Sequence, residues 1–171
     1  MIENRSHRIN KNYDNKEVYN FRGVCKSRLD REDQAIQDYT KSIQFDSANA
    51  YAFRNRSTSL EKVDRFEEAL DDLEVAIGLE PTNQKGYSFR GRIYRIRENY
   101  EQAIKNFNIA IQLDSTNYEN YFYRGNTKYD QRKFEDAIED YEFALELSPE
   151  NLDVIFWKGN ALYSMGRLAE A

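Results

Sequence analysis

A five-residue motif recurs along the chain at intervals of 34 or 68 residues. It is YNFRG at 19–23, YSFRG at 87–91 and YFYRG at 121–125. The interval of 34 residues, counted from the motif glycines, also reaches Ser57 and Gly159. A fixed period of this length predicts a chain of stacked structural repeats rather than one globular core, because each repeat packs only against its neighbours.

The period divides the chain into four full repeats and a partial fifth when the motif glycine is given position 8 of each repeat. The predicted repeats are residues 16–49, 50–83, 84–117, 118–151 and 152–171, after a polar N-terminal tail at 1–15. Apolar or small residues at positions 17, 20, 21, 24, 27 and 28 advance by three and four, which predicts one face of an α-helix. Positions 4, 8 and 11 do the same in the first half. Each repeat is therefore predicted to hold two helices, which we call helix A and helix B.

Small residues occupy three fixed positions of the repeat. Position 20 carries Ala35, Ala69, Ala103, Ala137 and Ala171. Positions 8 and 27 are also small, whereas position 24 holds a ring or leucine. Two helices approach closely only where side chains are small, and a bulky neighbour then fills the remaining space. By the same reasoning Cys25, at position 10 of the first helix A, is expected to be a small packing residue rather than a nucleophile.

The spacing of the small, aromatic and proline columns resembles the tetratricopeptide repeat (TPR) family. Pro81 and Pro149 stand just past the predicted end of a helix B, where proline prevents further helix. The resemblance covers 16–171 and implies an all-α fold, a right-handed α-solenoid of stacked antiparallel helix pairs. It also implies that the A helices line a concave groove. The first repeat departs from the pattern at Lys26, Glu32 and Ser42, which is typical of a terminal repeat whose outer face meets water.

The arginine of the motif lies sixteen residues before a carboxylate or amide at position 23 of the same repeat. The four pairs are Arg22 with Asp38, Arg56 with Asp72, Arg90 with Asn106, and Arg124 with Asp140. An arginine and an aspartate can form two parallel charge-assisted hydrogen bonds of fixed geometry. We therefore expect one structural clamp between helices A and B in each full repeat.

No catalytic or metal-binding pattern is found. His7 is the only histidine and belongs to the polar tail, so the sequence offers no histidine-based triad or histidine metal site. The glycines are isolated, so no phosphate-binding loop is expected. The sequence predicts a protein that is not an enzyme and needs no cofactor or metal.

Composition narrows the partners and the compartment. The net charge is −5, which disfavours nucleic acid. No apolar run is long enough to span a membrane. The single cysteine cannot form an intrachain disulfide. A cytoplasmic protein without membrane contact is the expectation.

Charge separates between the two kinds of helix. The predicted A segments, 17–29, 51–63, 85–97, 119–131 and 153–165, hold fourteen Lys or Arg and five Asp or Glu. The predicted B segments, 32–45, 66–79, 100–113 and 134–147, hold two and fifteen. The surplus of positive charge is largest in the third A segment, which has no acidic residue.

The resemblance implies that certain helix A positions face a peptide groove. From these positions the sequence predicts a groove that binds an acidic, partly apolar peptide segment of a partner protein, because arginines suit carboxylates, amides can pair with a peptide backbone and rings hold apolar side chains. The candidate residues are Arg54, Lys85, Arg92, Arg95, Phe122, Asn126, Tyr129, Phe156 and Asn160. The alternative is that these are ordinary solvated side chains.

The sequence ends at Ala171, early in the fifth predicted helix B. Arrays of this type usually end in a polar capping helix, so the chain is expected to be a fragment, or to have this end covered by a partner. A regulatory or scaffold segment of a larger enzyme or assembly factor is the alternative function. Self-association through the uncapped C-terminal end is a further alternative.

Overall fold

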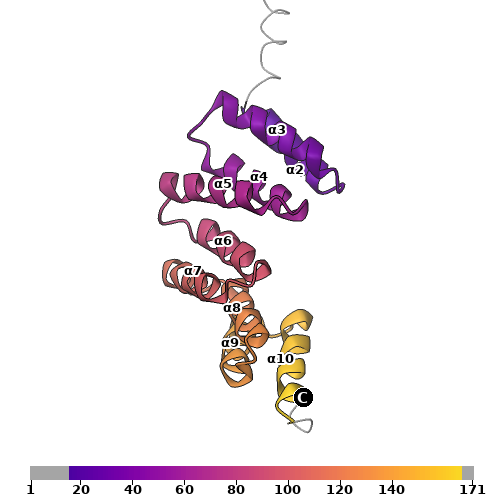
Figure 1. Ribbon diagram of the computed structural model, residues 1–171, viewed down its shortest axis with the longest axis vertical. Helices are drawn as coiled ribbons and strands as arrows, with labels where there is room; N and C mark the ends of the chain where they lie inside the picture. The colour runs from indigo at the N-terminus through magenta and orange to yellow at the C-terminus, as the bar shows by residue number, and fades with distance from the viewer. Residues whose placement is uncertain (1–15, 167–171) are drawn as a thin grey trace, which may run out of the picture. The chain divides into compact units, whose positions relative to one another are not determined.

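A computed structural model of the protein describes residues 16–166, and all regular structure within this range is helical (Figure 1). The helices are α2 (Lys16–Ser27), α3 (Glu32–Phe45), α4 (Ala50–Lys62), α5 (Phe66–Leu79), α6 (Gln84–Ile96), α7 (Tyr100–Leu113), α8 (Tyr118–Asp130), α9 (Phe134–Leu147) and α10 (Leu152–Ser164). The prediction of an all-α helical-repeat fold is confirmed. The predicted tail at 1–15, with His7, and Ala171 lie outside the described residues.

Helices A and B alternate as predicted. The A helices are α2, α4, α6, α8 and α10, and the B helices are α3, α5, α7 and α9. The four predicted B segments have the same bounds as the observed B helices, whereas each A helix begins one residue before its predicted start. Each A helix packs against the B helix that follows it after a short turn, as in α2 with α3 and α8 with α9.

The described residues form two compact parts, which divide between Pro81 and Thr82. In the first part α3 also packs on α4, and in the second part α7 packs on α8 and α9 on α10 (Figure 1). Each part is thus a stack of helix pairs, and its core lies between the A and B helices. The position-20 alanines of the full repeats are 0% exposed, which is the close packing that the small residues predicted.

The motif glycines lie directly beneath the rings of position 24. A Cβ atom at Gly91 would lie 2.9 Å from the Phe107 ring, and one at Gly23 would lie 2.6 Å from the Tyr39 ring. Real Cβ atoms do not approach other atoms this closely, so any larger residue would push helix B away. The predicted reason for the small residue at position 8 is confirmed.

The turn between helix A and helix B uses a left-handed backbone residue at position 15 in every repeat. These residues are Asp30, Asp64, Glu98, Arg132 and Gly166, with φ between 54° and 79°. In the four full repeats the next residue donates its backbone N–H to the carbonyl of position 11, as in Asn99 to Tyr94 at 2.8 Å. This bond satisfies a carbonyl at the end of helix A. Glycine and aspartate, which adopt this conformation more readily than most residues, occupy three of the five positions, whereas Glu98 and Arg132 give no sign of the turn.

Four A helices begin after an asparagine at position 34. The residues are Asn49, Asn83, Asn117 and Asn151, and each side chain accepts a hydrogen bond from a backbone N–H in the first turn. Asparagine is among the preferred N-cap residues because it satisfies one of the free N–H groups at a helix start. This column, spaced by 34 residues, was a readable signal that would have placed the helix starts correctly.

Two expectations about the first repeat are wrong. Cys25 is exposed, because no other described helix covers the face of α2 that carries it. Glu32 and Ser42 do not face water as residues of a terminal cap would, since both are buried. Glu32 binds Lys62 at 2.6 Å, and Ser42 donates to the carbonyl of Lys16 at 2.7 Å. These two polar residues thus hold neighbouring helices together.

Candidate functional site

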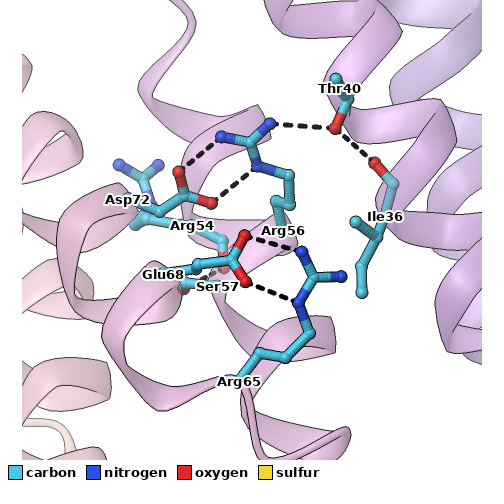
Figure 2. Close-up of polar contacts among 8 residues, drawn as sticks. All are labelled: Ile36, Thr40, Arg54, Arg56, Ser57, Arg65, Glu68 and Asp72. Atoms are coloured by element: carbon cyan, nitrogen blue, oxygen red, sulfur yellow. Dashed lines mark hydrogen bonds and ion pairs between the residues drawn. The ribbon is translucent and has the colours of Figure 1, made fainter.

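The arginine of position 7 joins helix A to helix B. Arg56 on α4 donates from Nε and Nη2 to the two carboxylate oxygens of Asp72 on α5, at 2.8 and 2.6 Å (Figure 2). Asp72 is buried, so the pair is held in a fixed geometry with little competition from water. The two residues are sixteen positions apart, the spacing at which the sequence predicted a clamp.

The structure brings together the other predicted clamp residues in the same way. Arg22 forms a two-bond fork with Asp38, at 2.7 and 2.5 Å, and Arg124 binds Asp140 at 2.5 to 3.1 Å. The third repeat differs, because the partner of its arginine is an amide. Arg90 donates to Asn106 Oδ1 at 2.8 Å, and the amide nitrogen of Asn106 donates to a backbone carbonyl.

Each clamp arginine also lies over the aromatic ring three residues before it. The guanidinium carbon is 4.9 Å from the ring centre of Tyr19 in the first repeat, and 5.6 Å from that of Tyr121 in the fourth. The corresponding rings of Phe53 and Tyr87 lie under Arg56 and Arg90. A ring face attracts a cation and restricts its position. Each of the three fixed residues of the motif therefore has its own contact. The aromatic ring packs against the arginine, the arginine binds helix B, and the glycine leaves room for the side chain of position 24.

The clamp also reaches the preceding repeat, which sequence reasoning missed. Arg56 Nη1 donates to Thr40 Oγ1 on α3 at 2.9 Å, and the threonine hydroxyl donates to the carbonyl of Ile36 (Figure 2). Arg124 bonds Asn108 on α7 at 2.7 Å. Both acceptors lie sixteen residues before the arginine. One arginine thus connects its own helix A, the following helix B and the preceding helix B.

Two lysines that depart from the apolar pattern at position 11 bind the clamp aspartates as second cations. Lys26 lies 2.7 Å from Asp38, and Lys128 lies 2.9 Å from Asp140. Burial alone would raise the pKa of Asp38, but hydrogen bonds from Arg22 and Lys26 lower it below its ordinary value.

Asp72 has no second cation of this kind, because position 11 of its repeat is Leu60. Burial raises the pKa of Asp72 above its ordinary value, and the bonds from Arg56 offset only part of that effect. The two aspartates therefore have opposite pKa shifts, because burial dominates at Asp72 whereas the bonds from two cations dominate at Asp38.

Consecutive A helices are also bonded to each other. In the first part of the chain Asn55 donates to Asn20 at 3.2 Å, and in the second part Asn120 donates to Gln84 at 3.0 Å. Arg95 binds Asp130 at 2.7 Å. The candidate Arg95 therefore has a carboxylate partner in the next helix A, 35 residues on, which the sequence pattern did not predict.

Arg54, the candidate residue in the first part, is only 7% exposed and binds Glu80 at 2.5 Å. The face of α2 and α4 beside it forms a cleft of about 670 Å³. Its lining includes Asn20, Val24 and Tyr51. The side chain of Arg54 is thus buried and bound to an acid, and Glu80, its partner, lines the cleft.

Two of the candidates on α6, Lys85 and Arg92, are cations with different environments. Lys85 is exposed near the start of the helix. Arg92 lies over two rings, with its guanidinium carbon 5.6 Å from the centre of Phe89 and 5.5 Å from that of Tyr123. The rings restrict the position of this guanidinium.

The remaining candidates lie on α8 and α10. Asn126 is buried, and its Oδ1 accepts a hydrogen bond from the Tyr141 hydroxyl at 2.8 Å. Phe122 packs against Tyr141 and its own neighbour Tyr123. Burial raises the pKa of Tyr141, so its hydroxyl remains a donor. Asn126 thus has a structural partner that the sequence pattern did not predict.

Tyr129 meets the edges of Phe134 and Trp157, and its hydroxyl lies 3.3 Å from Ser164 Oγ. Phe156 is 63% exposed, and Asn160 is half-buried one turn further along α10. Phe156 on α10 and Lys85 on α6 are therefore the candidates whose side chains are exposed.

The described residues show no arrangement suited to metal chemistry. No three His, Cys, Asp or Glu side chains of residues 16–166 come together as a metal site. In the same range, no helix combines the length and the apolar character needed to cross a bilayer.

Comparison with family models gives matches over three stretches of the chain, which together touch every predicted repeat except 50–83. A model described as TPR repeat matches residues 91–132 and 125–166, and a model described as Tetratricopeptide repeat matches residues 16–49. A comparison with curated proteins gives no match.

Among solved structures, the chain is similar to TTC0263, a thermophilic TPR protein of Thermus thermophilus. The TM-score is 0.80 and the identity 18%, over 91% of this chain and 85% of that one. It is also similar to MamA, with a TM-score of 0.74, 21% identity and coverage of 91% and 85%. A third similar structure is YrrB, described as a TPR protein with an unusual peptide-binding site, with a TM-score of 0.69, 19% identity and coverage of 96% and 85%. At these identities the likeness shows the fold alone.

Proposed function

Because the chain belongs to the tetratricopeptide repeat family, whose members are generally non-catalytic interaction modules, we propose that its A helices bind an acidic peptide segment of a partner protein. The proposed site is the helix A face of α6, α8 and α10. It includes Lys85, Arg92, Phe156 and Asn160, with Arg95, Phe122, Asn126 and Tyr129 in support. Arg54 belongs to the equivalent face of α4.

The charge of α6 is the observation that carries this proposal. The helix contains Lys85, Arg90, Arg92 and Arg95 and no acidic residue. In the other full repeats the clamp arginine is bound to an aspartate, whereas Arg90 is bound to the neutral amide of Asn106. The clamp therefore leaves more positive charge on α6 than on the other A helices, and a carboxylate-bearing peptide would complement it.

Exposed rings on α10, which contacts α8 as α6 does, favour a peptide that also carries apolar side chains. Phe156 and Tyr163 on α10 are 63% and 64% exposed. Large aromatic side chains at a protein surface are enriched where a partner binds. The peptide-binding site in the description of YrrB supports the same class of ligand. We also propose that the protein acts in the cytoplasm and does not bind nucleic acid.

The test is a selection of short random peptides displayed on phage against the wild-type chain and a Lys85→Glu/Arg92→Glu variant. We expect the wild type to enrich peptides rich in Asp and Glu, and the variant to lose this enrichment. Lys105→Glu, which reverses an exposed charge on helix B α7, is the matched control and should keep it. Circular dichroism must show equal helicity for all three proteins. Peptides without an acidic excess, or equal enrichment by both variants, would show that the proposal is wrong.

A further inference from the structure

One exposed face of α9 carries acidic and apolar side chains together. Glu139, Glu142, Phe143, Glu146 and Leu147 follow one another at intervals of one or three residues, so they lie on one side of the helix. All five are exposed, Phe143 by 51% and Leu147 by 42%. We call these five residues the acidic face of α9. The helix has no basic residue, and Glu146 lies in its last turn, where the helix dipole is already negative.

The fold of the repeat does not need this charge. The three glutamates occupy positions 22, 25 and 29, where α7 has Lys105, Asn108 and Gln112, and α3 has Gln37, Thr40 and Gln44. In α5 the first two positions are acidic but the third is Gly78. Like charges three or four residues apart repel each other along a helix. The acids therefore do not stabilise the helix that carries them, which favours a role in binding.

The exposure of the apolar side chains is a property of the repeat. Leu147 lies at position 30, and Leu79 and Leu113 at the same position are 40% and 38% exposed, although a further described repeat follows each of them. The ring of Phe143 is stacked on that of Tyr121 of α8, with ring centres 5.7 Å apart. This contact restricts the ring at the surface without burying it. The face thus presents a positioned ring and a leucine beside its acids.

Most of the negative charge of this face has no counter-charge within the described part of the chain. Glu142 binds Lys158 of α10 at 3.0 Å, whereas Glu139 and Glu146 form no ion pair with any of residues 16–166. A positively charged partner would complement these carboxylates, and nucleic acid or an anionic lipid surface would be repelled. A second copy of the chain is a poorer match, because its net charge is also negative, at −5.

From these observations we propose that the acidic face of α9 binds a basic amphipathic helix of a partner protein. Apolar side chains of that helix cover Phe143 and Leu147, and its lysines or arginines bind Glu139 and Glu146. A helix suits this face because the side chains of one helix fill the spaces between those of another. The surface shares no residue with the proposed peptide site, and its ligand has the opposite charge.

The probe is a synthetic amphipathic helix of about 15 residues, in which leucines at i, i+4 and i+7 are flanked by lysines. Its affinity for the full chain is measured by fluorescence anisotropy of the labelled peptide. We expect saturable binding, weakened at least about tenfold by Glu139→Lys/Glu146→Lys in the protein, because reversal of charge turns attraction into repulsion. Phe143→Ala should weaken binding to a similar degree, since a ring that becomes buried is a typical interface anchor.

Each variant has a matched control in the same chain. Asp71→Lys/Glu74→Lys makes the same change in net charge at exposed positions of α5, and Leu113→Ala removes an exposed apolar side chain of α7. Both controls should keep the wild-type affinity, and circular dichroism should show wild-type helicity for all four variants. A second peptide, with glutamate in place of each lysine, should bind Glu139→Lys/Glu146→Lys more tightly than it binds the wild type.

Absence of saturable binding, or equal affinity of the wild type and Glu139→Lys/Glu146→Lys for the basic peptide, would overturn the proposal. Equal weakening by the two double variants would show a general attraction to negative charge and would overturn it as well. Unchanged affinity of Phe143→Ala would show that the apolar side chains take no part, which also contradicts the proposal. Concentration-dependent dimerisation of the chain without peptide, abolished by Phe143→Ala, would assign the face to a second copy instead and overturn it too.

Discussion

The ring of Tyr141 lies so close to the backbone of Gly125 that an added Cβ atom would be 2.7 Å from ring carbon Cε1. The same atom would be 3.2 Å from the carbonyl oxygen of Ala137. Tyr141 is fully buried, so its ring cannot move into solvent. The helices α8 and α9 can thus approach this closely only because residue 125 has no Cβ atom.

We therefore predict that Gly125→Ala lowers the free energy of unfolding by about 1–3 kcal/mol, the typical effect of overpacking a close helix contact. This loss would outweigh the gain of up to about 1 kcal/mol that alanine brings to a helix interior. Urea unfolding, monitored by circular dichroism, measures the net change in the free energy of unfolding.

Gly159→Ala is the control for this prediction, because no described atom lies within 4 Å of the new methyl group. Only the helix propensity then changes, and we expect the free energy of unfolding to rise by up to about 1 kcal/mol. The two substitutions are chemically identical and should have opposite signs. Stabilisation by Gly125→Ala would contradict the close contact between Gly125 and Tyr141.

The fold could be predicted from the sequence because packing repeats with the period. The alanines of position 20 and the ring or leucine of position 24 fix helix B in each full repeat, and the B helices have their predicted bounds. The predicted starts of the A helices are one residue too late, because the apolar pattern does not show the N-cap asparagines such as Asn49. The turns at position 15 could be predicted only in part from residue type, because Glu98 and Arg132 are unusual in a left-handed conformation, whereas Asp30 and Asp64 are of a type that adopts it more often.

The candidate site was harder to predict because contacts between repeats join different positions of two repeats, and a comparison of positions within one repeat does not show them. The Arg–Asp pairs were found because both residues belong to one repeat. The bond from Arg56 back to Thr40, and that from Arg95 forward to Asp130, cross into another repeat. Burial also changes what a side chain can bind. The amide of Asn126 is suited to a peptide backbone, but its oxygen already accepts a hydrogen bond from Tyr141.

Acidification should affect two clamp aspartates in opposite ways. The pKa of Asp72 is raised in the folded protein, so the folded state binds this proton more tightly than the unfolded state does. Its contribution to stability is present below the ordinary value of 3.8 and is lost as pH rises through the raised pKa. The pKa of Asp38 is lowered, so its contribution is present above 3.8 and is lost as pH falls through the lowered pKa.

The comparison of Asp72→Asn and Asp38→Asn with the wild type measures this difference. As pH falls from neutral to about 3, the stability difference between wild type and Asp72→Asn should grow, because the wild type gains from protonation. The difference between wild type and Asp38→Asn should shrink over the acidic end of the range. Urea unfolding at several pH values gives both curves, and parallel slopes would refute the assignment of opposite shifts.

The left-handed residue at position 15 offers a stabilising substitution. Glu98 has a φ of 58°, which is costly for a residue with a Cβ atom and neutral for glycine. We predict that Glu98→Gly raises the free energy of unfolding by about 1 kcal/mol. Gln131→Gly, at the C-cap of α8 with a φ of −77°, is the control and should not stabilise the protein. The midpoint of thermal unfolding should thus be higher for Glu98→Gly than for Gln131→Gly. Equal midpoints would show that backbone strain at Glu98 does not limit stability.

Arg56 and Arg65 form two-bond forks with carboxylates in the same region, yet the two forks should differ in their effect on stability (Figure 2). Asp72, the partner of Arg56, is buried, whereas Glu68, the partner of Arg65, is largely exposed. A lysine in place of Arg56 would keep the charge but lose the fork geometry and the bond to Thr40. We predict a loss of about 1–3 kcal/mol, because a buried acceptor is left partly unsatisfied.

Arg65→Lys is the matched control, and it should not change the free energy of unfolding measurably, because water replaces the lost bond at an exposed pair. Equilibrium unfolding in urea, at one pH and one salt concentration, measures the two variants side by side. If the two variants lose equal stability, the burial of Asp72 does not strengthen the clamp. If only Arg56→Lys is destabilised, the unbroken column of basic residues at position 7 is explained by its contacts within the fold rather than by a ligand.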